Sequence, residues 1–393
     1  MKTRALSLVL VAMSMAGCAN FSGLDTQGQR LDANTLQTGK SLSGVTLSTA
    51  AWPTADWWKS LGDPQLDGLI HEALQNSPDM QVASARAHQA EAAAYAADAA
   101  RMPTLDASAG VSRSRLAKDQ DPRGQGDAYA TVRNIGASFN YNFDLWGGQR
   151  AAWEAALGQA RAAEVDQQAA RLTLAANVAK AYSDLGQAHI VRDLANDDLK
   201  RTRQMLDLSK RRLSSGIDSE YQYQQTESLE ASSQSQLIDA EKQLQSAKIA
   251  LAVLLGKGPD RGGELTRPNV LKPSAVAVPS VLPAELLGRR PDLIAARWRV
   301  EAASKNVAAS KTRFYPNLNL SASAGAESLL GDAMFGSASR FFSIAPTISL
   351  PIFDGGRLRA DLDARDADYD LAVAQYNKTL VQALGDIGNT LMQ

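Results

Sequence analysis

Two segments of the 393-residue chain, 76–106 and 289–319, repeat one pattern at a separation of 213 positions. The first contains SPDM at Ser77–Met80, and the second contains RPDL at Arg290–Leu293. In each copy an Ala-rich run of helical character leads through a proline into alternating apolar and polar residues, and a Gly-Gly pair follows. Solenoid repeats have periods of only about 20–50 residues. The spacing therefore indicates a duplicated half-molecule that mixes long helices with strands.

Four segments alternate apolar and polar side chains, which is typical of strands with one apolar face. They form two expected β-hairpins, at 104–143 and 317–352. A bilayer would cover the apolar face, but unpaired strand edges are not tolerated in lipid. Strands from several chains could close the sheet, and three copies would supply twelve strands, an even number within the range of outer-membrane barrels. The side chains expected to face the membrane are Leu105, Ala107, Ile135, Phe139, Tyr141, Phe143, Leu318, Leu320, Ile348 and Leu350.

Residues 149–255 carry apolar positions at heptad spacing, interrupted once at Ser214–Ser219. This pattern predicts a long antiparallel coiled-coil hairpin. Its first arm, about 65 residues at 1.5 Å each, would reach roughly 100 Å. The expected fold is therefore mainly α with membrane β, and combines long coiled-coil hairpins with two β-hairpins.

The first 18 residues have the features of a processing segment. Lys2 and Arg4 are followed by a short apolar run, which ends at Cys18, the single cysteine of the chain. Small residues precede Cys18, as in the cleavage box of bacterial lipoproteins, so we expect its thiol to be lipidated. An ordinary signal peptide that carries a cysteine near its cleavage site is the alternative. Residues 19–50 are rich in Ser, Thr, Gly and Gln, and we expect an extended tether there.

The expected domain organisation follows the repeat. The first copy occupies 51–256, a Pro-rich linker follows at 257–283, and the second copy occupies 284–393. The outgoing helix of the second copy, 357–391, has no return partner before the sequence ends. The second copy is thus expected to be truncated, and we expect a chain expressed as written not to assemble a sealed tunnel.

Composition and motifs argue against several classes of function. The formal net charge of −1 and the lack of a dense basic tract give no footprint for nucleic acid. The three histidines, His71, His88 and His189, lie far apart, and no phosphate-binding loop, nucleophile elbow or zinc-protease motif is present. We therefore expect no enzymatic activity, no metal and no cofactor.

The order of motifs along the chain resembles the outer-membrane efflux proteins of the TolC type, and most closely their lipoprotein branch. The resemblance covers the chain after residue 50 and rests on Trp52-Pro53, Asp56–Lys59, Leu61–Ile70, Ser77–Met80, Ala250–Gly256 and Arg289–Arg297. It implies a homotrimer with a twelve-stranded β-barrel in the outer membrane on an α-helical tunnel. It also implies two protein partners, a periplasmic adaptor and an inner-membrane pump of the resistance-nodulation-division class.

The resemblance further implies a role for the turn of the helical hairpin. In the family this turn carries an Arg-x-x-x-Gly-x-x-Ser segment that contacts the adaptor. Here the matching residues are Arg212, Gly216 and Ser219, with Leu213 and Ile217 between them. A turn that simply needs glycine, beside a solvated Arg212, explains the same residues equally well.

The expected function is therefore a passive exit duct for small molecules, lipid-anchored in the outer membrane and extending into the periplasm. The alternative is a lipid-anchored coiled-coil structural protein or adhesin without a pore. The strands distinguish the two, because a stalk has no need of four strands with an apolar outer face. The exported substrate is not encoded in any recognisable motif.

Overall fold

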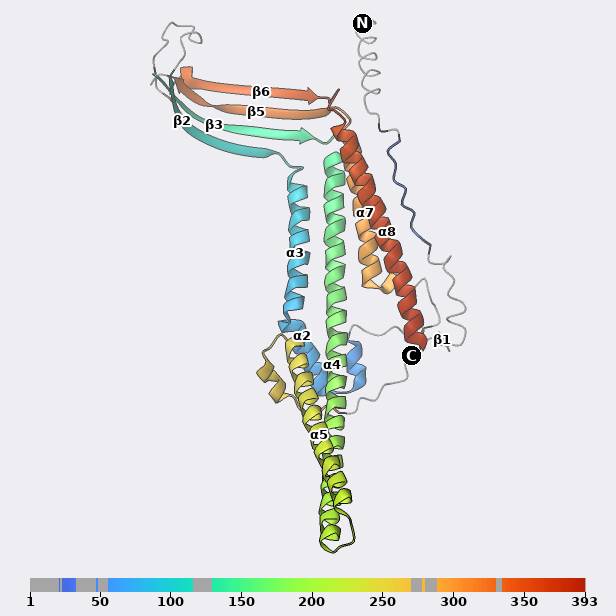
Figure 1. Cartoon of the computed structure of the whole chain (residues 1–393). Coiled ribbons are helices and arrows are strands. Elements are labelled where there is room, and N and C mark those ends of the chain that lie inside the picture. Colours follow the sequence, from blue (N-terminus) through green and yellow to red (C-terminus); the bar gives the residue numbers. More distant parts are fainter. Residues whose placement is uncertain are drawn as a thin grey trace. The chain divides into compact units, whose positions relative to one another are not determined.

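A computed structural model describes residues 21, 23–32, 47–48, 56–115, 129–269, 278–279, 288–329 and 334–392. The chain is mainly helical, and four of its strands form one antiparallel sheet (Figure 1). This confirms the expected fold class. The expected lipidation residue Cys18 lies outside the described residues, as does part of the expected tether and of the linker.

The chain divides into two compact units, and neither corresponds to one copy of the repeat. Unit 1 comprises Met1–Thr35, His88–Ala162 and Leu293–Ala383. Unit 2 comprises Leu36–Ala87, Ala163–Asp292 and Leu384–Gln393. Both copies of the repeat contribute strands to unit 1, so the duplicated halves are joined through their sheet rather than folded separately.

The sheet of unit 1 has the strand order β2-β3-β5-β6, with every neighbouring pair antiparallel. Its strands are β2 (Thr104–Arg115), β3 (Tyr129–Phe143), β5 (Asn317–Leu329) and β6 (Arg340–Ser349), and the short 3-10 helix η5 (Ser337–Ser339) precedes β6. Strands β2 and β6 are its edges. All four strands connect to helices at one end of the sheet (Figure 1).

Helices α3 (Pro78–Ala99) and α7 (Pro291–Thr312) are the matching helices of the two copies, and each has 22 residues. Each begins with proline, which suits the first helical position because the amide hydrogen is not needed there. Each leads into a strand of the sheet, β2 or β5. The duplication is therefore structural as well as sequential.

The strand-to-helix junctions are also duplicated, and a carboxylate caps the helix at each one. The Oδ atoms of Asp144 accept hydrogen bonds from the backbone amides of Gln149 and Arg150 at the start of α4 (Gly148–Ser214). Asp354 accepts from the amides of Gly356 and Leu358 at the start of α8 (Arg357–Met392). A carboxylate at this position satisfies free amide hydrogens and complements the helix dipole.

Unit 2 is built on α4 from Ala163 onward and on α5 (Glu220–Leu254), which form an antiparallel hairpin. Helix α2 (Pro64–Asn76) and the 3-10 helices η2 (Trp57–Leu61) and η4 (Pro259–Glu264) complete it, and β1 (Leu47–Ser48) pairs with β4 (Val278–Pro279). The core of this unit lies where α2 packs on the hairpin, and its buried residues include Leu66, Ile70, Leu174, Val178, Tyr182, Leu185, Leu251 and Leu255.

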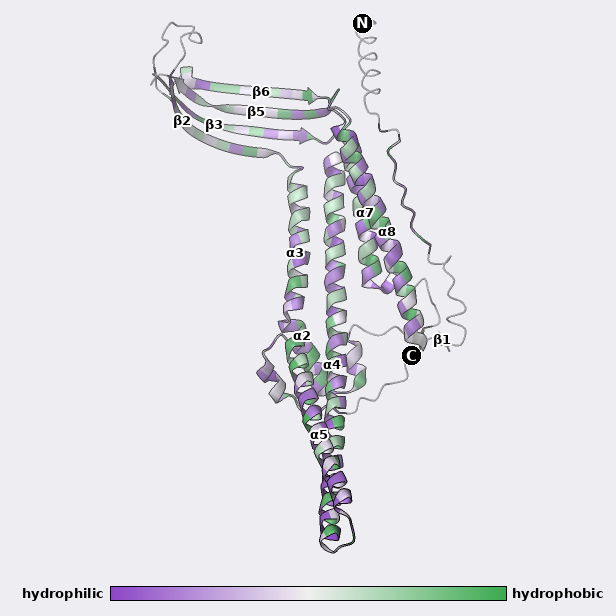
Figure 2. Ribbon diagram, viewed as in Figure 1, coloured by the Kyte–Doolittle hydropathy of each residue, from purple (hydrophilic) through white to green (hydrophobic). Residues whose placement is uncertain are grey.

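The helices carry hydrophilic and hydrophobic residues mixed along their lengths (Figure 2). In the described part of the chain, no helix has an apolar stretch long enough to cross a bilayer.

Candidate functional site

The four-stranded sheet separates apolar from polar side chains. Residues directly opposite each other in neighbouring strands share a face, and alternate residues along one strand do so as well. Leu105 is opposite Phe139, Phe139 is opposite Ala322, and Ala322 is opposite Ile344. The same register places Ala107, Ile135, Tyr141, Phe143, Leu318, Leu320 and Ile348 on this face. Nine of the ten side chains expected to face the membrane thus share one face of the sheet, hereafter the apolar face.

Leu350, the tenth, lies one residue beyond β6, which ends at Ser349. Ser349 pairs with Asn317, so the next pair would join Leu350 to Pro316. Proline has no amide hydrogen to donate, and Pro351 follows on the other side. The prediction that the strand includes Leu350 is therefore wrong by one residue.

The apolar face is uncovered in the single chain. Leu105 is 75% exposed, Ile344 is 71% exposed and Ile348 is 72% exposed. Contiguous exposed apolar surface of this kind marks contact with a membrane or another protein. The opposite, polar face carries mostly Ser, Asn, Thr and Gly, with two carboxylates, Asp106 and Glu327.

On the polar face, the ring of Phe341 lies over a pair of glycines. Gly136 and Gly325 are direct partners in the β3–β5 ladder, and Phe341 is the partner of Gly325 in the next ladder. A Cβ atom built on Gly325 would stand 3.0 Å from a ring carbon of Phe341 and 2.3 Å from the carbonyl oxygen of Ile135. The glycines therefore permit close backbone approach, and the aromatic ring covers what they leave open.

The N-terminal segment 23–32, part of the expected tether, docks on α8. The amides of Gln27 and Gly28 donate to the carboxylate of Asp370, and the amide of Leu31 donates to Oδ1 of Asn377 at 2.8 Å. At the start of this segment, Phe21 packs edge-on against Phe314, with ring centroids 5.3 Å apart. Phe314 lies just before β5, so the N-terminal segment reaches the helix-to-strand junction of unit 1.

The turn of the α4–α5 hairpin, hereafter the tip, is held by backbone hydrogen bonds. Gly216 has a φ angle of +69°. Its amide donates to the carbonyl of Leu213 at 2.9 Å, and the amide of Ile217 donates to the carbonyl of Arg212 at 2.9 Å. These two bonds and the left-handed glycine make a Schellman motif that ends α4. Gly216 thus has a structural role that favours glycine, whatever the tip contacts.

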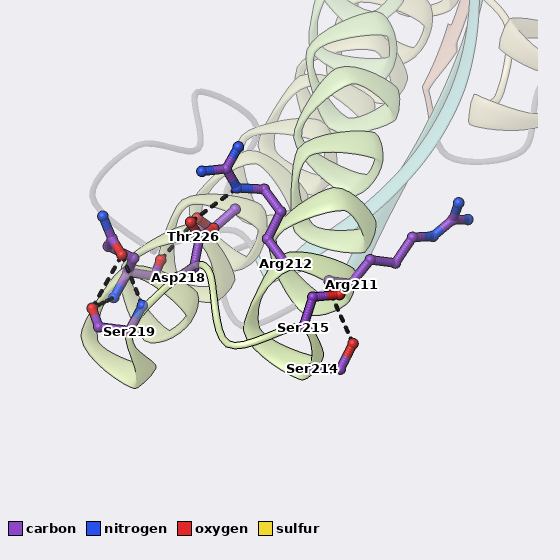
Figure 3. A network of polar contacts seen from close by, with 8 residues as sticks. Arg211, Arg212, Ser214, Ser215, Asp218, Ser219 and Thr226 are labelled. Atoms are coloured by element: carbon purple, nitrogen blue, oxygen red, sulfur yellow. Dashed lines mark hydrogen bonds and ion pairs between the residues drawn. The ribbon is translucent and has the colours of Figure 1, made fainter.

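Two of the expected tip residues are engaged within the chain (Figure 3). The Nε atom of Arg212 donates to Oδ1 of Asp218 at 2.9 Å, which ties the end of α4 to the turn. The hydroxyl of Ser219 accepts from the amide of Gln222, while the Gln222 side chain accepts from the amide of Ser219. This reciprocal pair is a capping box that starts α5. The side chains of Arg212 and Ser219 therefore shape the tip.

The remaining tip side chains are more open. Leu213 is half-buried, whereas Ile217 is 65% exposed and Tyr221, in the first turn of α5, is 76% exposed. Sequence reasoning did not single out Asp218, Gln222 or Tyr221. A Ser-x-x-Gln signal at Ser219–Gln222 was available for the capping box.

Above the tip, polar contacts join the two arms of the hairpin. Arg203 of α4 donates to Glu230 of α5 at 2.9 Å. The Ser233 hydroxyl donates to Oδ2 of Asp198 at 2.9 Å. Hydrogen bonds from Arg201 and Ser233 hold the pKa of Asp198 below its usual value, so its carboxylate is charged at neutral pH.

Among the described residues, no three His, Cys, Asp or Glu side chains are grouped so as to hold a metal ion. His189 is buried in unit 2, and His88 lies on a helix surface with Glu91 nearby. His71 is a neighbour of Gln75 on α2. The three histidines of the sequence are thus not brought together.

The chain is similar in sequence to known outer membrane proteins. The family model described as outer membrane efflux protein matches residues 69–257 and 282–393. The chain is 36% identical over 375 residues to the fusaric acid resistance protein FusA of Burkholderia cepacia, covering 93% of this chain and 69% of that protein. It is 30% identical over 386 residues to the multidrug resistance outer membrane protein MdtP of Escherichia coli O157:H7, covering 95% and 78%.

A solved structure shows the same arrangement of elements. The crystal structure of the outer membrane protein VceC from Vibrio cholerae superimposes with a TM-score of 0.78 at 35% identity, covering 87% of this chain and 81% of that one. The outer membrane channel CmeC of Campylobacter jejuni shares the fold, with a TM-score of 0.85. The sheet with one apolar face, the helical hairpin and these matches lead to one conclusion: the chain belongs to the outer membrane efflux protein family.

Proposed function

We propose that this chain forms the exit duct of a tripartite efflux system. Copies of the chain close their sheets into one channel wall in the outer membrane, and the tip engages a periplasmic adaptor. The observation that carries this proposal is the four-stranded sheet, which has one exposed apolar face and two edge strands. Within the described residues, each edge strand has a neighbour on one side only.

Closure of the sheet between copies explains both the exposed apolar face and the two edge strands. Unpaired backbone groups of β2 and β6 would cost several kcal/mol each in hydrocarbon. β2 runs away from the helices and β6 runs toward them, so β6 of one copy meets β2 of the next in the antiparallel sense of the other ladders. Three copies give twelve strands, with the apolar face toward lipid and the polar face toward the lumen.

The side chains of the polar face would line the lumen of the duct. Its Ser and Asn side chains, with Asp106 and Glu327, suit a water-filled path that admits polar and cationic solutes. Transport through it is passive, so the work of export comes from an inner-membrane pump. The names of FusA and MdtP refer to fusaric acid resistance and multidrug resistance. We infer that this chain likewise passes small toxic compounds out of the cell.

The tip is the proposed contact for the adaptor. Ile217 is an exposed apolar side chain on a turn that its own backbone bonds hold rigid, and Leu213 lies beside it. A fixed apolar side chain ringed by polar groups is a suitable anchor for a protein partner. Arg212 and Ser219 act through the shape of the turn, because their side chains bond to Asp218 and Gln222.

Lipidation at Cys18 fits the docking of the N-terminal segment. Cys18 precedes Phe21 by three residues, which span at most about 11 Å. Phe21 packs at the helix-to-strand junction, where the apolar face begins. Acyl chains on Cys18 would therefore reach the inner leaflet beside the strands, and the hydrogen bonds to Asp370 and Asn377 would hold the anchor there.

Cysteine cross-linking across the edge strands tests closure directly. Ser108 of β2 is changed to Cys together with Ser343, Ala345 or Thr347 of β6, all on the polar face. In membranes, one of these registers is expected to give a covalent trimer on a denaturing gel. The matched control, Ser138→Cys with Ser323→Cys, joins direct partners within one chain and should stay monomeric.

Absence of covalent oligomers in all three registers, with the control pair oxidised, would exclude closure by these edges. Conductance separates the duct from a stalk or adhesin. The purified trimer in a planar bilayer should carry ion current, whereas a stalk or adhesin would carry none.

A further inference from the structure

The charged side chains of the four strands are segregated by face. Four arginines, Arg113, Arg115, Arg133 and Arg340, lie on the apolar face, and all four are exposed. Both carboxylates of the strands, Asp106 and Glu327, lie on the polar face. Within the described residues of these strands, the apolar face therefore carries cationic groups and no anionic group.

The four arginines lie together at the loop end of the sheet, away from the helices. Arg133 is opposite Val111 on one side and Ser328 on the other, while Arg340 is opposite Ala326. Arg113 follows Val111 on the same face of β2, and its guanidinium lies 5.2 Å from the centre of the Tyr129 ring. Arg115 is the direct partner of Tyr129. These four residues are hereafter the arginine band.

The height of the band matches the edge of a bilayer. From Phe143, the last residue of β3, to Arg133 is about ten residues, or roughly 33 Å along the strand. Strands in outer-membrane barrels tilt by about 35–45°, which leaves about 25 Å along the membrane normal, the usual height of the apolar band. Tyr129 suits this level, because aromatic side chains gather at the membrane–water interface.

We propose that the arginine band binds the phosphate groups of phosphorylated lipids in the outer leaflet of the membrane. The proposal rests on the proposed function, which turns the apolar face toward lipid. The band then lies at the level of outer-leaflet headgroups on the lipid side of the wall. Guanidinium groups bind phosphate through paired hydrogen bonds, and their aliphatic stems pack along apolar surface. The exposed cationic groups of this face are complementary in charge to an anionic headgroup.

Lipid binding by the purified full chain tests this proposal. The probes are bisphosphorylated lipid A, a glucosamine lipid of bacterial outer leaflets, and the same lipid after removal of both phosphates. Bound lipid per chain is measured by native mass spectrometry. The unsubstituted protein is expected to bind the phosphorylated probe about tenfold more tightly than the other.

Two variants separate charge from geometry. Substitution of all four band residues by Gln should abolish the preference for phosphate, and substitution by Lys should retain part of it, because Lys keeps the charge but loses the paired geometry. The control removes equal charge from exposed helix residues by Gln substitution and should leave the preference unchanged; its positions are Arg86, Arg171, Arg297 and Arg357.

Conductance in bilayers is measured for each variant as a test of insertion. Equal binding of both probes by the unsubstituted protein would overturn the proposal that the arginine band binds lipid phosphate. So would an unchanged preference in the Gln variant. Neither result would contradict the proposed duct. An unsubstituted protein that neither inserts nor conducts would overturn the proposed function, and this proposal with it.

Discussion

The hydroxyl of Tyr182 on α4 donates a 2.8 Å hydrogen bond to Oδ2 of Asp63, whose other oxygen accepts from the amides that start α2. The Tyr182 ring is almost fully buried in the core of unit 2. Burial and the Asp63 carboxylate raise the pKa of Tyr182 well above its usual value, so the hydroxyl remains a donor at all physiological pH values. One buried bond thus fixes the start of α2 against the hairpin.

Tyr182→Phe keeps the ring and removes this donor. Oδ2 of Asp63 then loses a partner in a buried site, and we expect a loss of about 1–3 kcal/mol in the free energy of unfolding. Urea unfolding followed by helical circular dichroism measures the loss. The control is Tyr221→Phe, at an exposed position on α5, which should unfold as the unsubstituted protein does. Equal stability of both variants would show that the Tyr182–Asp63 bond contributes nothing.

His189 should make unit 2 sensitive to mild acid. Burial is the main cause that lowers its pKa, the cations Lys248, Arg192 and Arg267 act in the same direction, and Asp193 opposes them. The unfolded chain therefore binds a proton that the folded chain resists, and stability falls as pH drops below about 6.5. His189→Gln should flatten the dependence of the unfolding temperature on pH between about 7.5 and 5.5.

Substitution of the exposed His88 by Gln provides the comparison for this effect. Its side chain is 83% exposed, so the pH profile of the unsubstituted protein should persist in that variant. A profile that is flat in the unsubstituted protein would exclude a role for His189.

Gly325→Ala should block assembly of the sheet and its closure between copies. The new Cβ would stand 2.3 Å from the Ile135 carbonyl oxygen and 2.8 Å from Cα of Gly136, both of which are backbone atoms that cannot move aside cheaply. We expect loss of the trimer on unheated gels and loss of conductance. Ser323→Ala, two residues earlier on the same face, should assemble as the unsubstituted protein does. Normal assembly of the Gly325 variant would show that the β3–β5 approach is not required.

Gly216→Val should weaken adaptor binding and leave insertion in the membrane intact. A φ angle of +69° costs a residue with a Cβ atom about 1–2 kcal/mol, and a β-branched residue more, so the Schellman turn would rearrange. Gly216→Asn is the matched control, since Asn tolerates this region. Adaptor recovered after chemical cross-linking measures the effect, and trimer on an unheated gel measures insertion. Equal loss of both would contradict the assignment of the tip.

Ile217→Ser tests the side chain rather than the turn. Ile217 contributes its backbone amide to the turn, and its side chain is 65% exposed, so stability should change by less than about 0.5 kcal/mol. Adaptor recovery in the same cross-linking assay should nevertheless fall. Unchanged recovery would remove Ile217 from the proposed contact.

The alternation of apolar and polar residues was enough to place the strands and their faces, because alternate residues of a strand lie on the same face of the sheet. It failed at the loop end of β3. Regular alternation of apolar and polar residues begins only at Ile135, although the strand itself starts at Tyr129. Thr131 and Arg133 occupy positions that the pattern reserves for apolar residues, so the first part of β3 gives no alternating signal.

Contacts between distant segments left no local signal. The docking of Gln27 and Gly28 on Asp370 joins residues more than 300 positions apart, so the local sequence predicted only an extended tether there. The Arg212–Asp218 pair spans a turn, where helical spacing rules do not apply. By contrast, the Ser219–Gln222 capping box was readable from four consecutive residues.

The arginine band also affects how long the sheet, once inserted, stays in the membrane. One arginine at the bilayer midplane costs about 2–4 kcal/mol. Extraction of a single chain toward the periplasm would drag Arg113, Arg115, Arg133 and Arg340 through the hydrocarbon together. The same barrier opposes entry, so insertion should be slow, and once complete it should be irreversible on the time scale of cell growth.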